Sequence, residues 1–146
     1  QAKIYPDYAD NAAAFNEGML HYYQKNYVEA RRNFNHVMQD YKDLFYGLNS
    51  RGYLLQIYYE TEDMVGLESM AHAFRMFLDR NKEISSERRR QYIAFINHLK
   101  RLINIPPRDR ERLEKLGNDI LEKAERGMGT DWLLSKIEAL QAVHFR

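Results

Sequence analysis

Apolar residues recur three and four positions apart through most of the chain, which is the period of an amphipathic α-helix. The clearest stripes fall within residues 44–60, 64–78 and 86–104. Their apolar positions are Leu44, Leu48, Gly52 and Leu55 in the first stripe, Met64, Leu67, Ala71, Phe74 and Leu78 in the second, and Tyr92, Phe95, Ile96, Leu99 and Leu102 in the third. This pattern predicts an all-α protein.

Capping and breaking residues divide the pattern into seven predicted helices. Pro6 and its polar neighbours indicate an irregular lead-in over residues 1–10, and Pro106-Pro107 must end a helix because proline removes a backbone donor. The expected helices run from Asp10 or Asn11 to about Gln24, from Tyr27 to Asp40, from Phe45 to Glu60, from Met64 to Leu78 with Asp63 as a cap, from Ser85 or Ser86 to about Asn104, from Arg108 to Ala124, and from Thr130 or Asp131 onward.

Residues 18–34 carry a pattern more specific than helix periodicity. Gly18 lies within the first helix, where glycine lowers helix propensity by about 1 kcal/mol relative to alanine. A close neighbour would explain its presence. Ala30 and Phe34 lie one turn apart on the second helix, a small residue beside a large one. With a tight turn at Lys25-Asn26, these positions predict a helical hairpin that is closely packed at Gly18 and Ala30.

The same stretch resembles the tetratricopeptide repeat, whose signature places a glycine in the first helix and an alanine with an aromatic residue in the second. The matching positions are Gly18, Tyr27, Glu29, Ala30 and Phe34. Two positions depart from the family pattern, because His21 takes the slot of a tyrosine and Lys42 that of a closing proline. Gly52 follows Gly18 by 34 residues, the repeat length of this family.

Later parts of the chain match less closely. Leu67 occupies the alanine slot of the second hairpin and Ala71 the aromatic slot, so that small and large are exchanged. The first helix of this hairpin is expected to be about a turn longer. In the third hairpin, Gly117, Leu121 and Ala124 repeat the spacing of Ala30, Phe34 and Val37. We interpret this pair as a degenerate repeat.

The resemblance implies a right-handed stack of about three helix-turn-helix hairpins, a TPR-like α-α superhelix, in one domain of residues 1–146. The expected hairpins span about residues 11–41, 44–80 and 86–124. A further helix at about 131–145, with Leu133, Ile137 and Leu140 on its apolar face, would cap the open end of the stack. The C-terminal half also resembles bacterial repeat proteins of unassigned function.

Composition narrows the classes of function only slightly. Hydrophobic residues at 45% and charged residues at 29% are typical of a globular protein. The net charge of +1 divides into −3 over residues 1–81, +4 over 82–126 and 0 over the remainder. The charge is unevenly distributed along the chain, but the charge of each segment is too small to indicate a partner. The absence of cysteine excludes disulfides, thiol catalysis and thiolate metal sites.

The sequence contains no apolar run near the roughly 18 residues that a membrane span requires, and no signal peptide is recognisable. The chain begins at Gln1 rather than at methionine. We therefore expect a mature form or a piece of a longer protein, and a cytoplasmic location is favoured.

No residue pattern indicates catalysis, a metal or a cofactor. None of the five histidines pairs with another at a helical spacing of three or four. His21 is expected to be a packed, hydrogen-bonded residue of the hairpin, and Glu60, Glu62 and Asp63 to serve in a turn and cap. Glycine-rich phosphate loops and nucleophile elbows are absent. We expect a protein that is not an enzyme and needs no cofactor.

The resemblance implies a binding surface, because the first helices of such hairpins line a concave groove. By the repeat alignment, the groove positions are Phe15, Met19 and Tyr22 from the first helix, with Tyr23 as a further candidate, Asn49, Tyr53 and Gln56 from the third, and Asn97, Lys100 and Arg101 from the fifth. Ten of eleven tyrosines precede residue 60, and tyrosine is favoured at interfaces; these rings could equally fill core and rim positions. Phe15 and Met19 replace the Lys and Asn of carboxylate-clamp members, so a chaperone tail is not expected.

Two arginine clusters support an alternative function. Arg88-Arg89-Arg90 opens the fifth helix, and Arg108, Arg110 and Arg112 open the sixth, with Glu87, Asp109 and Glu111 interspersed. The simplest interpretation is that both clusters lie on solvent-exposed faces of their helices. In the alternative they bind a phosphorylated protein or an RNA backbone, although few aromatic residues accompany them. The leading hypothesis is a non-catalytic module that binds a protein or peptide.

Overall fold

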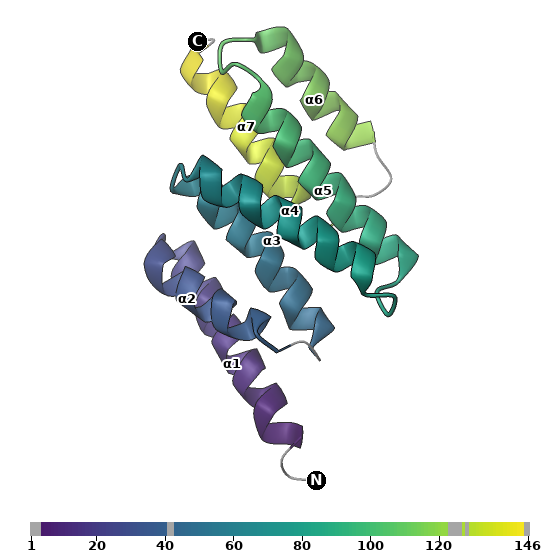
Figure 1. The fold of residues 1–146 in the computed structure, drawn as a ribbon. Coiled ribbons are helices and arrows are strands. Elements are labelled where there is room, and N and C mark those ends of the chain that lie inside the picture. The colour runs from purple at the N-terminus through teal and green to yellow at the C-terminus, as the bar shows by residue number, and fades with distance from the viewer. Residues whose placement is uncertain (1–3, 41–42, 123–126, 128, 145–146) are drawn as a thin grey trace. The chain divides into compact units, whose positions relative to one another are not determined.

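The computed structural model describes residues 4–40, 43–122, 127 and 129–144, and in this part of the chain it is all-helical, with seven helices and no strand (Figure 1). This confirms the predicted all-α class. The helices are α1 (Ile4–Tyr23), α2 (Tyr27–Met38), α3 (Leu44–Glu60), α4 (Met64–Arg80), α5 (Ser86–Asn104), α6 (Arg110–Glu122) and α7 (Thr130–His144).

The predicted irregular lead-in is wrong from Ile4 onward, because α1 begins there. Pro6 is the third residue of this helix. The first N–H groups of a helix have no intrahelical partner, so proline is tolerated in the first turn. Asp10 and Asn11 are therefore interior residues rather than caps. Asn11 is buried, and its Nδ2 donates to Oδ2 of Asp40 at 2.8 Å and to Oδ2 of Asp43 at 3.3 Å.

Side-chain caps fix four of the other helix starts. At α3, Oδ1 of Asp43 accepts from the N–H of Tyr46 at 3.1 Å. The N–H of Gly66 donates to Oδ1 of Asp63 at 2.9 Å, which confirms the predicted cap of α4. The N–H of Arg88 donates to Oγ of Ser85 at 3.2 Å, so Ser85 rather than Ser86 caps α5. At α6 the start is later than predicted, at Arg110, because Asp109 accepts from the N–H of Arg112. The predicted end of this helix, Ala124, lies outside the described residues.

The turns after α1 and α3 have the same backbone geometry. Lys25 has a φ of 62° and Glu62 a φ of 57°. In each turn, the residue after the one with positive φ donates to a carbonyl five positions back, Asn26 to His21 and Asp63 to Tyr58. This is the Schellman arrangement that ends a helix in a left-handed residue. The α1–α2 and α3–α4 connections thus use the same type of turn, and their left-handed residues lie 37 positions apart.

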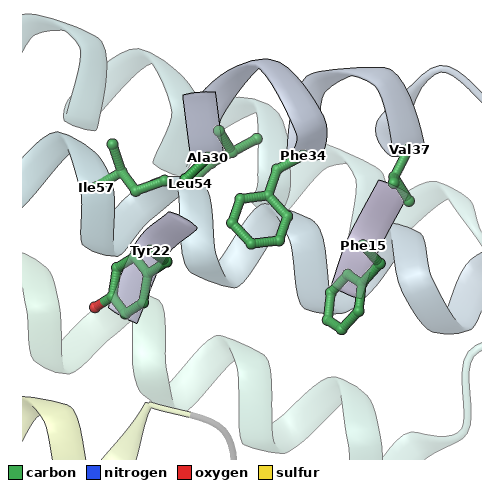
Figure 2. Packing of buried hydrophobic residues seen from close by; sticks show 7 residues of the cluster. All are labelled: Phe15, Tyr22, Ala30, Phe34, Val37, Leu54 and Ile57. Atoms are coloured by element: carbon green, nitrogen blue, oxygen red, sulfur yellow. The ribbon is translucent and has the colours of Figure 1, made fainter. Parts of the chain in front are cut away.

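The chain divides into two compact units, residues 1–77 and 78–146. In the first unit, α1 and α2 pack against each other and both contact α3. Figure 2 shows the apolar cluster they form, with the ring of Phe34 lying between those of Phe15 and Tyr22. The cluster comprises Phe15, Tyr22, Ala30, Phe34, Val37, Leu54 and Ile57.

Gly18 lies where α1 packs closely against α2. A Cβ at this position would lie 2.8 Å from Cε1 of Phe34 and 3.1 Å from Cβ of Asn33. Phe34 and Ala30 are both fully buried. These contacts confirm that Gly18 is a close-packing position, with Phe34 as its neighbour.

Contacts at both ends of α3 place α4 beside it in an antiparallel pair. Near the turn, a Cβ on Gly66 would lie 2.7 Å from the Tyr58 ring. Farther from the turn, the Arg51 guanidinium lies 3.6 Å from the ring centroid of Phe77. Leu67 and Ala71, the exchanged large and small residues, are both buried.

In the second unit, α5, α6 and α7 contact one another. Their buried apolar residues include Tyr92, Phe95, Ile96, Leu99, Leu102, Leu113, Leu116, Ile120, Leu133 and Ile137. The predicted equivalence of Leu121 with Phe34 fails, because Leu121 is 53% exposed and Phe34 is fully buried. The apolar face of α6 instead runs through Leu113, Leu116 and Ile120, so the spacing of Gly117 and Leu121 does not mark a repeat-like core here.

Candidate functional site

A continuous series of aromatic rings joins α1 to α3 in the first unit. Adjacent ring centroids lie 5.0, 5.1, 6.0, 5.2 and 5.3 Å apart along it. We call this series the aromatic row, and in order it consists of Phe45, Tyr46, Phe15, Tyr53, Tyr22 and Tyr23. The two helices contribute alternately to its centre, so the row follows the line along which α1 meets α3.

The row is buried at its centre and exposed at its ends. Phe45 is 50% exposed and Tyr23 is 67% exposed, whereas Phe15 and Tyr22 are each 7% exposed. Tyr46 and Tyr53 are half-buried. The hydroxyls of Tyr23 and Tyr53 lie 3.3 Å apart. Four rings of the row are therefore at least partly exposed to solvent, and they pack against the two buried rings, Phe15 and Tyr22.

Packing orients Tyr53, a half-buried ring of the row. The Tyr53 ring stacks on Phe34 with centroids 5.1 Å apart and planes inclined by 4°. Tyr53 also contacts Phe15 and Tyr22 edge to face. Aromatic pairs at such separations add about 0.5–1.5 kcal/mol beyond the burial of their area. Tyr53 is consequently oriented by three neighbours.

Tyr22 and Gln56 belong to the interior of the unit. The Tyr22 hydroxyl, which points away from Phe34 in Figure 2, donates to Oε1 of Gln56 at 2.6 Å. Gln56 is only 4% exposed. Burial, with a smaller contribution from Glu60, raises the pKa of Tyr22 above the usual range of a phenol. The Tyr22 ring is therefore part of the α1–α2–α3 core, which is the alternative to a groove position that the sequence leaves open.

The remaining predicted site residues divide between the two units. Met19 and Asn49 are half-buried on α1 and α3. Three others lie on α5, in the second unit: Asn97 and Lys100 are exposed and Arg101 is half-buried. Asn49, Tyr53 and Gln56 share α3 with Tyr46, which the groove alignment omits. Tyr46 precedes Tyr53 by seven residues, two helical turns, so this spacing could have revealed it.

The predicted arginine clusters have local roles. Nη2 of Arg89 donates to the carbonyl oxygens of Asn81 and Ile84 at 3.1 and 3.2 Å. These hydrogen bonds connect α5 to the segment that precedes it. Nε of Arg110 donates to Glu114 at 3.1 Å. These contacts account for part of the positive charge without a ligand.

Arg51 is a buried cation that sequence reasoning missed. It is 8% exposed, and its Nη1 donates to the carbonyl oxygen of Gly47 at 3.0 Å. Burial lowers the pKa of Arg51 to about 10. A single arginine among apolar and polar residues of α3 gives no periodic signal, which explains the omission.

In the described part of the chain, no group of three or more acidic and histidine side chains is arranged so that it could hold a metal ion. His21 is half-buried, and its Nδ1 lies 3.3 Å from Nδ2 of Asn26, in agreement with the packed role expected for it. No helix among the described residues is long and apolar enough to cross a membrane.

Comparisons with models of known protein families, with curated proteins and with solved structures gave no match.

Proposed function

We propose that this protein is a non-catalytic, tetratricopeptide-like helical module that binds an extended segment of another protein on the aromatic row. The observation that carries the proposal is the row itself. It places exposed Tyr23 and Phe45 at the two ends of a line of mutually supporting rings. Solvent-exposed aromatic rings arranged in one line suit a ligand that is itself extended.

The chemistry of the row favours a peptide over a small apolar molecule. Tyrosine buries a large area with little loss of rotamer freedom, and its hydroxyl can bond to a peptide backbone. Tyr23 and Tyr53 present their hydroxyls side by side. Because Tyr53 is already oriented by Phe34, a ligand would lose little free energy in ordering it.

The net charge of the first unit indicates which peptides it would favour. The first unit carries 7 Lys/Arg and 10 Asp/Glu, a net charge of −3. Complementary charge speeds association and rejects ligands of like sign. We therefore expect the bound segment to be neutral or basic, with apolar side chains that lie against the rings.

The repeat character of the first unit supports the tetratricopeptide-like part of the proposal. The α1–α2 and α3–α4 pairs end their first helices with left-handed Lys25 and Glu62. Gly18 packs closely against Phe34, and Ala30 is fully buried one turn before it, which is compatible with such a hairpin. In repeats of this kind, neighbouring first helices form one surface, and α1 and α3 are the helices that carry the aromatic row.

The test is selection of peptides from a displayed random library against the full chain, followed by affinity measurements with variants. Tyr23→Ala and Tyr53→Ala should each weaken binding of a selected peptide by about thirtyfold or more, since anchor aromatics contribute about 2 kcal/mol or more to binding. Val28→Ala is the matched control, because Val28 is 69% exposed in the same unit but outside the row.

Retained affinity in folded Tyr23→Ala and Tyr53→Ala proteins would contradict the proposal. So would a selection that returns only acidic peptides, or one that returns no binder at all.

A further inference from the structure

The second unit contains a cavity that is open to solvent and lined mainly by basic side chains, among them Arg112 and Lys115, which are 56% and 73% exposed. It lies between α5 and α6 and has a volume of about 350 Å³. Its lining residues are Lys100, Arg101, Asn104, Ile105, Arg112 and Lys115. Four of these six side chains are cationic. Lys100 and Arg101 come from the last turns of α5, while Arg112 and Lys115 come from the first turns of α6.

Two carboxylates neutralise part of this charge. Nη1 of Arg101 lies 2.9 Å from Oδ2 of Asp119, and Nζ of Lys115 lies 3.9 Å from the same oxygen. Nε of Arg112 lies 3.9 Å from Oδ2 of Asp109. The hydrogen bond from Arg101 is the main reason that the pKa of Asp119 is lowered, so this carboxylate is ionised at neutral pH.

The positive charge exceeds the negative charge around the cavity. Four cations and two carboxylates leave a net charge of +2. Within the described part of the chain, no carboxylate forms an ion pair with the Lys100 ammonium. Arg101 uses one of its guanidinium nitrogens on Asp119, and a guanidinium has five N–H donors in all. Donors therefore remain for a ligand.

We propose that the α5–α6 cavity binds a phosphate dianion, either free or carried by a small molecule. A phosphate monoester bears a charge of about −1.5 to −2 at pH 7, which matches the excess charge of the walls. Arginine forms bidentate hydrogen bonds with phosphate oxygens, and lysine adds a point charge. The side-chain N–H donor of Asn104 is not assigned to the ligand, since its Nδ2 already donates to the carbonyl oxygen of Lys100 at 2.8 Å.

The shape and lining of the cavity favour a small ligand over a nucleic acid. Its volume is at the lower end of the range of about 300–1,000 Å³ for ligand pockets. Ile105 is a buried apolar residue in its wall, which would contact a small apolar substituent. No aromatic ring lines the cavity, whereas binding of single-stranded RNA depends on base stacking. The site is independent of the aromatic row, which belongs to the other unit.

The test is calorimetric titration of the full chain, at constant ionic strength, with phenyl phosphate, inorganic phosphate and benzoate. We expect both phosphates to bind with Kd of about 1 mM or lower, and benzoate, which carries the same ring on a monoanion, to bind far more weakly. Tighter binding of phenyl phosphate than of inorganic phosphate would assign the dianion to a small organic molecule, and equal binding would assign it to free phosphate.

Variants separate the cavity from general surface charge. The Lys100→Gln/Arg112→Gln double variant should lose about tenfold or more in affinity, because it removes two charge-assisted contacts. Arg110→Gln is the matched control, since Arg110 lies on the same turn of α6 but pairs with Glu114 outside the cavity. Asp119→Asn should strengthen binding, because it removes the carboxylate that occupies Arg101.

Several results would overturn the proposal. Benzoate binding as tightly as phenyl phosphate would show that the site does not select a dianion. Equal losses in Arg110→Gln and the double variant would show a diffuse electrostatic effect. Binding of an RNA oligonucleotide, with no binding of either phosphate, would indicate a nucleic-acid surface instead.

Discussion

The distance between α1 and α2 depends on a few small residues. Gly18 lies directly against Phe34, and Ala30 lies on the same face of α2 as Phe34, fully buried. The large ring and the small residues together fill the space between the helices. Phe34 also stacks on Tyr53, so it connects Gly18 to the aromatic row. A substitution at Gly18 should therefore also affect the position of the Tyr53 ring.

Gly18→Ala should destabilise the protein, although alanine is the better helix former. The substitution gains about 1 kcal/mol in helix propensity. The new Cβ would lie 2.8 Å from Cε1 of Phe34 and 3.1 Å from Cβ of Asn33, and overpacking of this kind costs about 1–3 kcal/mol. Phe34 is fully buried, so its ring can move away only by displacing other residues of the core. Urea denaturation would measure the net loss in the free energy of unfolding.

A double-mutant cycle with Phe34→Leu controls for this interpretation. Leucine removes the ring edge that meets the new methyl group, so Gly18→Ala should be less harmful in the Phe34→Leu background. A gain of stability for Gly18→Ala in the otherwise unchanged protein would contradict the close packing described here.

Single residues also show where sequence reasoning stops. Gly18, Ala30 and Phe34 could be identified as packing positions, because their spacing and size contrast are visible in the sequence. The burial of Tyr22 could not, since its partner Gln56 lies 34 residues away and is itself polar. The exposure of Leu121 was missed for a related reason: the spacing of a small and a large residue does not reveal which face of α6 meets α5 and α7.

At the level of elements, the ends of the helices follow local chemistry. Asp63, Ser85 and Asp109 each accept from a backbone N–H three residues later, and such caps are readable in a sequence. The prediction of an irregular segment around Pro6 is wrong, because proline is tolerated in the first turn of α1. The left-handed residues at Lys25 and Glu62 were also hidden, since glycine usually marks this conformation.

Glycine at these two turns should stabilise the protein. The left-handed conformation costs an L-residue about 1–2 kcal/mol, and the extra freedom of glycine in the unfolded chain offsets part of the gain. Lys25→Gly and Glu62→Gly should each add about 0.5–1 kcal/mol to the free energy of unfolding. The gain should be larger at Glu62, because a negative charge at a helix C-terminus opposes the helix dipole and a positive charge complements it.

Alanine substitutions provide the control for the turn prediction. Lys25→Ala and Glu62→Ala keep the strained conformation, so neither should match its glycine counterpart in chemical denaturation. Equal gains for alanine and glycine would show that side-chain charge, rather than backbone conformation, determines the effect.

For the whole molecule, the two units differ in charge and in the chemistry of their surfaces. The first unit has a net charge of −3 and carries the aromatic row. The second has 15 Lys/Arg and 11 Asp/Glu, a net charge of +4, and carries the basic cavity. The sequence indicated both tendencies, through the early tyrosines and the later arginines. It could not place Lys115 and Arg112 opposite Lys100 and Arg101, because only the packing of α6 on α5 brings them together.

The most direct test of the proposed function is NMR of the full chain with ¹³C-labelled tyrosine, titrated with a selected peptide. If the peptide lies along the aromatic row, the ring signals of Tyr23, Tyr46 and Tyr53 should shift. The signals of Tyr92, which is buried in the second unit, should not. Shifts confined to tyrosines outside the row, with those of Tyr23 and Tyr53 unchanged at saturation, would contradict the proposal that the row is the binding surface.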